Sequence, residues 1–128
     1  MKRTMPVAAV ALLLSAGAVS AVEQDNFMVS TGADLAALCA VTPSHADYAA
    51  SIHMCEGYIV GVNQFHEAWM RAKGGTGIYC LADADAGAPT RDEVASNFAA
   101  WVAGDDDAAA APAVEALMRW AAFTYPCK

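Results

Sequence analysis

Four cysteines are the residues of this sequence whose chemistry is best defined by their number and spacing. They are Cys39, Cys55, Cys80 and Cys127, separated by 16, 25 and 47 positions. These gaps include no Cys-x-x-Cys pair, and no pair of histidines lies nearby at the spacing of zinc ligands. An even number of cysteines in an exported chain indicates two disulfides instead, with three possible pairings.

The histidines and serines do not form a catalytic pattern. His45, His53 and His66 are separated by 8 and 13 positions, so no two share a helix face at the i, i+4 spacing of a metal site. His66 lies on an apolar stripe and is interpreted as a satisfied or interfacial histidine. The serines lack the setting of a nucleophile elbow; those considered are Ser44, Ser51 and Ser96. We therefore expect no enzyme, no metal site and no cofactor.

The first 21 residues have the features of a secretory signal peptide. Lys2 and Arg3 give a positive start, residues 7–19 are apolar, and small residues precede a cleavage point after Ala21. The apolar run is shorter than the roughly 20 residues that a membrane-spanning helix needs. We expect a signal peptide over residues 1–21, a single domain over residues 22–128, export to the periplasm and no membrane partner.

The charge balance limits the class of partner. The chain has 14 acidic and 7 basic residues, with a formal net charge of −7. An anionic surface repels nucleic acids and anionic lipids and favours a basic partner, although acidity also simply keeps proteins soluble. We therefore exclude nucleic acid and expect a protein partner if there is one.

Hydrophobic periodicity predicts an all-α, four-helix bundle-like domain. Leu35, Leu38 and Cys39 mark a short first helix, which ends before Pro43. The second helix is predicted over residues 46–71, because apolar residues recur at steps of three and four until a glycine cluster at residues 74–77.

The second half of the chain supplies two more helices. A capping box over residues 90–93 begins the third helix, which ends near Gly104. Two signals disagree on the start of the fourth helix, since Asp105 suits a first turn and Pro112 is tolerated only in one. Residues 22–29 show no clear period and are interpreted as a mobile lead-in.

Two glycines interrupt the second helix four residues apart. Each glycine costs about 1 kcal/mol against alanine in a helix interior, so Gly57 and Gly61 indicate a close helix crossing, either inside the monomer or across a dimer. The tryptophans lie at helical spacing and are interpreted as core rather than as a ligand cage; they are Trp69, Trp101 and Trp120.

The order of the helices favours one disulfide pairing. If the helices run antiparallel, the end of the first lies beside the early part of the second, which brings Cys39 near Cys55. The third and fourth helices then go away and return, bringing Cys127 to Cys80. We expect these two pairs.

Four motifs in this order resemble the Rap/Tai family of type VI secretion immunity proteins. The resemblance implies an exported helical scaffold with two disulfides that binds and neutralises a cell-wall amidase effector in the periplasm, as a homodimer. Where the family usually has a proline after its third cysteine this chain has Leu81-Ala82, and Asn63 stands where an acid is common. The motifs are Asp34-Leu35 ahead of Cys39, the CEGYIVG stretch from Cys55 to Gly61, Tyr79-Cys80, and Tyr125-Pro126-Cys127.

The acidic connections between helices are the candidate partner-binding loops, because they combine charge with an expected exposed position. Their residues are Asp83, Asp85, Asp105, Asp106 and Asp107. The alternative function is a small acid-activated periplasmic chaperone, which would expose apolar surface as its carboxylates become protonated. Binding of a hydrophobic dye near pH 3 would distinguish that alternative from a stable immunity protein.

Overall fold

The computed structural model describes residues 22–83 and 87–128. Within these residues the chain forms helices and no named strand, so the all-α prediction is confirmed. The predicted signal peptide over residues 1–21 lies outside the described residues. The elements in order are η1 (Gln24–Met28), α1 (Gly32–Cys39), α2 (Tyr48–Lys73), η2 (Leu81–Asp83), α3 (Arg91–Ala103), α4 (Asp106–Ala110) and α5 (Ala113–Thr124).

The short helix α1 lies at the centre of the packing. Its Leu35 and Leu38 side chains are 0% exposed. It packs against η1 and against each of the other four α-helices. Its start is fixed by a capping box, in which the Thr31 hydroxyl accepts the Asp34 N–H and the Asp34 carboxylate accepts the Thr31 N–H. A helix of only 8 residues is thus held by both its cap and its neighbours.

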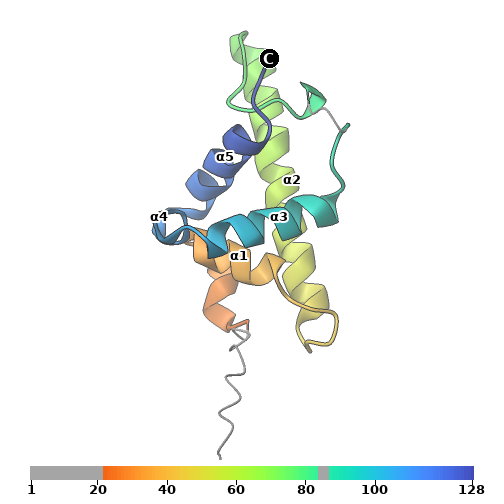
Figure 1. Ribbon diagram of the computed structural model, residues 1–128. Coiled ribbons are helices and arrows are strands. Elements are labelled where there is room, and N and C mark those ends of the chain that lie inside the picture. The colour runs from red at the N-terminus through yellow and green to blue at the C-terminus, as the bar shows by residue number, and fades with distance from the viewer. Residues whose placement is uncertain (1–21, 84–86) are drawn as a thin grey trace, which may run out of the picture.

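The long helix α2 runs along one side of the domain and is crossed by α1 and α3 (Figure 1). It buries only Ser51, Cys55 and His66 along its 26 residues. The shorter α5 packs on α1 and α3. Two mainly apolar hollows lie between α2 and α5, and one of them is also lined by α3.

Two disulfides join segments that the helix order brings together, and the predicted pairing is confirmed. Cys39 pairs with Cys55 at a Cα–Cα distance of 5.2 Å, which ties the end of α1 to α2. Cys80 pairs with Cys127 at 4.8 Å, which ties the segment after α2 to the C-terminus. In the chain-entropy model, loops of 16 and 47 residues correspond to about 3 and about 4 kcal/mol of stabilisation.

The predicted fourth helix is two helices, and both conflicting signals are correct. Asp105 caps α4, because its carboxylate accepts the Ala108 N–H at 2.9 Å. Ala111 then adopts an extended conformation (φ −66°, ψ 158°), as the residue before a proline tends to do. Pro112 becomes the N-cap of α5. The proline therefore separates the two helices instead of sitting inside one.

The lead-in before α1 was also predicted wrongly. Residues 24–28 form the short helix η1, which packs on α1. The Asn26 amide donates a hydrogen bond to the Asp34 carboxylate at 3.0 Å. Because η1 lacks an apolar period and is held by this side-chain bond, periodicity could not detect it.

A close helix crossing lies at Gly32, and none lies at the glycines of α2 within the monomer. A Cβ atom at Gly32 would overlap the Ala108 carbonyl oxygen and lie 2.8 Å from the Ala116 Cβ atom. At Gly57 and at Gly61 a Cβ atom would meet nothing within 4 Å. The prediction of a close crossing at Gly57 and Gly61 is therefore wrong within the monomer, and only the intermolecular alternative remains.

Replacing Gly32 with alanine should lower the free energy of unfolding by about 2–3 kcal/mol, because α4 and α5 must move to admit the methyl group. The matched Gly61→Ala change should raise the stability of the monomer by about 1 kcal/mol, since alanine is the better helix former and the space is open. Denaturant unfolding at low protein concentration measures both. Similar effects of the two substitutions would contradict this assignment of the crossing.

Candidate functional site

The segment after α2 folds back along that helix, and we call residues 77–81 the return segment. The backbone N–H of Ile78 donates to Nε2 of His66 at 3.0 Å, and the Tyr79 ring stacks on the His66 ring at 4.1 Å. His66 is 5% exposed, so its interpretation as a satisfied histidine is confirmed. The Cys80 N–H donates to the Tyr125 carbonyl at 2.8 Å. The return segment is thus held by α2 on one side and by the C-terminus on the other.

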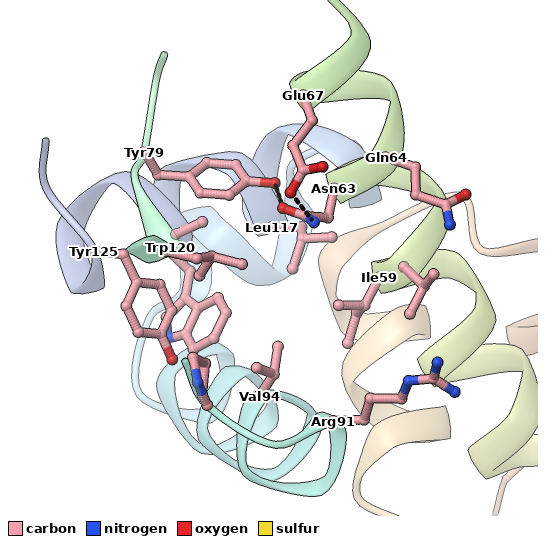
Figure 2. Close-up of a pocket in the computed structure, with 14 residues that line it drawn as sticks. Ile59, Asn63, Gln64, Glu67, Tyr79, Arg91, Val94, Leu117, Trp120 and Tyr125 are labelled. Carbon is pink, nitrogen blue, oxygen red and sulfur yellow. Dashed lines mark hydrogen bonds between the residues drawn. The ribbon is translucent and has the colours of Figure 1, made fainter. Parts of the chain in front are cut away.

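A cleft of about 350 Å³ opens beside the return segment, between α2, α3 and α5 (Figure 2). Leu117, Trp120 and Ala121 of α5 form its buried floor. Ile59 of α2 and Val94 of α3 contribute apolar walls. The Trp120 ring is fixed by edge-to-face contacts with Phe98 and Tyr125, at centroid distances of 5.8 and 5.6 Å. The cleft is therefore a mainly apolar recess with a closely packed tryptophan at its floor.

A chain of hydrogen bonds occupies one end of the cleft. The Tyr79 hydroxyl donates to Oδ1 of Asn63 at 3.0 Å, and the Asn63 amide donates to Glu67 at 3.0 Å (Figure 2). Burial raises the pKa of Tyr79, and the Glu67 carboxylate raises it further, to about 12. The hydroxyl therefore remains a proton donor at neutral pH.

A second apolar hollow lies between α2 and α5, and we call it the glycine groove. It encloses about 450 Å³ and its lining includes no charged residue. Gly57 and Gly61 leave a flat strip on α2 at its base. Its lining residues are Gly57, Tyr58, Gly61, Val62, Phe65, Val114 and Met118.

Large aromatic side chains extend the glycine groove along α2. Phe65 is 70% exposed and stacks on Trp69, which is 53% exposed, at 6.4 Å. The Lys73 ammonium lies 5.1 Å from the Trp69 ring. The interpretation of Trp69 as core is therefore wrong, because this half of α2 extends past the helices that cover its first half (Figure 1). Trp120, in contrast, is buried as predicted.

The acidic connections differ in what their carboxylates do. Asp105 is committed to capping α4. Asp106 and Asp107 are exposed in the first turn of that helix. Asp83 ends η2, whereas Asp85 lies outside the described residues. Only Asp106 and Asp107 are thus placed as free, exposed carboxylates of the predicted loops.

The described residues contain no group of three or more potential metal ligands. Across residues 22–83 and 87–128, no helix combines the length and the hydrophobicity that crossing a membrane requires.

Comparison with known families decides what kind of protein this is. Residues 31–127 match the Rap1a immunity proteins. The chain belongs to the Rap1a immunity protein family. The match runs from the N-cap of α1 to the last cysteine and so includes both disulfides. A comparison with the curated proteins finds no match, and a comparison with the solved structures finds none either.

Membership in the Rap1a family indicates that the functional surface of this chain binds a protein. An immunity protein acts by binding an effector protein, so the relevant surfaces are those that a protein partner can reach. The matching motif residues have structural roles, since Cys55 lies in a disulfide and Asp34 in a helix cap. Sequence reasoning missed the cleft, because Asn63, Tyr79 and Trp120 lie far apart in the chain. The one available signal was the pairing of Cys80 with Cys127, which brings their neighbours together.

Replacing Tyr79 with phenylalanine should lower stability at neutral pH by about 1 kcal/mol, through loss of the hydrogen bond to Asn63. The raised pKa adds a pH dependence. The contribution of the Tyr79 hydroxyl to the free energy of unfolding is fully present below pH 10.0. It is lost as the pH rises through about 12, because Tyr79 ionises at a lower pH in the unfolded chain than in the folded protein. Urea unfolding from pH 8 to 12 should show a shallower alkaline decline for Tyr79→Phe than for wild type. An equal alkaline decline in the two proteins would contradict this role of Tyr79.

Proposed function

We propose that this protein is a periplasmic immunity protein that binds and neutralises a type VI secreted cell-wall amidase, with no catalytic turnover of its own. Membership in the Rap1a immunity family carries the proposal. Its two disulfides, which leave no free cysteine among the described residues, support an oxidising compartment such as the periplasm. The predicted signal peptide supplies the route of export.

Neutralisation requires only that a rigid body cover the effector's active-site cleft. We assign the first contact to the exposed carboxylates Asp106 and Asp107 and to the acidic stretch that contains Asp83 and Asp85. Opposite charges on two partners accelerate their encounter more than they strengthen the final complex. Asp105 does not take part, because its carboxylate caps α4.

Reversing both exposed charges, in an Asp106→Lys, Asp107→Lys protein, should slow association with the cognate amidase roughly tenfold at low salt, with a smaller effect on dissociation. The difference from wild type should shrink as salt is raised, because screening removes steering. Surface plasmon resonance with the cognate amidase measures both rates.

The double reversal Asp25→Lys, Asp47→Lys is the charge-matched control, because both residues are exposed and lie outside the acidic connections. An unchanged association rate for the Asp106→Lys, Asp107→Lys protein would remove this surface from the proposal. Absence of any binding by wild type would argue against the amidase itself.

The second component of the proposal is a homodimer formed through the glycine groove. Gly57 and Gly61 have open space on a helix face where alanine would be more stable. The groove lining is apolar at its centre, and the exposed Phe65 borders it. A two-fold axis perpendicular to α2, between Gly61 and Phe65, would make the two copies of α2 antiparallel and place Phe65 of each copy on the glycine strip of the other, which is the self-complementary contact that a symmetric dimer needs.

A Phe65→Glu protein should be monomeric at concentrations where wild type has twice the mass of the chain, because the carboxylate would have to be buried in the interface. Gly61→Leu should have the same effect by filling the strip, without loss of monomer stability. Sedimentation equilibrium measures the mass. Phe123→Glu is the control, since Phe123 is 78% exposed and does not line the groove. A monomeric wild type at high micromolar concentration would contradict the dimer.

A further inference from the structure

The cleft beside the return segment contains one charged group with no assigned role. Arg91, the first residue of α3, lines the cleft and is exposed. Among the described residues it has no hydrogen-bond or ion-pair partner from its side chain. It is also the single positively charged residue of the lining. Its planar guanidinium is therefore available at a mainly apolar recess, in a chain with twice as many acidic as basic residues.

The carboxylates near the cleft are already engaged. Glu67 accepts a hydrogen bond from Asn63 and lies 3.8 Å from the Arg71 guanidinium. Glu93 accepts the Thr90 N–H and hydroxyl, each at 2.8 Å. Neither needs a cation from a ligand, whereas Arg91 offers a fork of N–H donors that matches a carboxylate. The available charge of the cleft therefore selects an anionic group.

The shape and lining of the recess limit the rest of the ligand. Trp120 and Leu117 form a floor with little polar surface, so the ligand must have an apolar body. The volume of about 350 Å³ is near the lower end of the range for small-molecule sites. The hydrogen-bonded side chains of Tyr79, Asn63 and Glu67 occupy one end, which favours a compact body over a chain that runs through (Figure 2).

We propose that this cleft binds a small hydrophobic monocarboxylate, with its apolar body on Trp120 and its carboxylate paired with Arg91. The site is separate from the glycine groove and from the exposed acidic residues of α4. It does not depend on the identity of the effector or on dimerisation. The binding step is reversible and involves no covalent change.

Two probes test the site in the intact protein. 1-Naphthaleneacetate supplies an aromatic body with a carboxylate, and 2-(1-naphthyl)ethanol supplies the same body without charge. Titration followed by ¹H–¹⁵N NMR should give saturable shifts of the Trp120 indole and of Tyr79 and Val94 amides, with a dissociation constant on the order of 1 mM or tighter for the acid.

Substitution at Arg91 isolates the charge. Arg91→Gln should weaken the acid roughly three- to tenfold and leave the affinity for the alcohol unchanged, because only the acid uses the guanidinium. Equal losses for both probes, or no loss for either, would overturn the assignment of Arg91. Absence of saturable shifts at the cleft in wild type would overturn the site.

A filled cleft provides the second comparison. Val94→Trp places an indole in the recess and should abolish binding of both probes. Asn97→Trp adds the same side chain one turn along α3, outside the lining, and should bind as wild type does. Ile59→Trp fills the cleft from α2 and replaces Val94→Trp if thermal unfolding shows that variant to be misfolded. Wild-type affinity in a folded filled variant would show that the probes bind elsewhere.

Discussion

Close contact around α1 is the constraint on which the rest of the structure depends. Alanine supplies much of the core, and the largest fully buried side chains among the described residues are Phe98, Leu35 and Leu38, followed by Cys55 and Ser51. Small side chains let helices approach until backbone meets backbone, as α1 meets α4 at Gly32. Such a core buries little apolar area for each residue, so less stability comes from burial alone. The two disulfides compensate by reducing the freedom of the unfolded chain.

The sequence was sufficient for features that are local or covalent. The capping box at Thr90, the glycine stop after α2 and the helix class follow from side chains within a few positions of one another. The disulfide pairing followed from helix order alone. Gly57 and Gly61 were misjudged because spacing reveals that a helix face is flat, but not what lies against it. Gly32 escaped notice because a glycine at a helix start looks like an ordinary cap.

The cleft could not be predicted, because its parts meet only after the return segment reverses direction. Tyr79 is separated from Asn63 by 16 positions and reaches it through a turn whose glycines have positive φ values, at Gly74 and Gly75. Trp120 and Arg91 arrive from two other helices. The spacing of residues within one helix does not show which residues of other helices they will contact. The two hollows are lined by different residues of α2 and α5.

Because the Cys80–Cys127 disulfide forms only under oxidising conditions, the final structure of the cleft depends on the compartment in which the chain folds. Without that bond, the wall formed by Tyr79 is attached to the C-terminal end through the Cys80 to Tyr125 backbone hydrogen bond and packing. In a reducing cytosol the newly made chain would have neither crosslink, and the return segment would be held on α2 only by hydrogen bonds and packing. If the chain is exported as proposed, oxidation after translocation would add the crosslink. The recess would then be completed in the compartment where the protein is proposed to act.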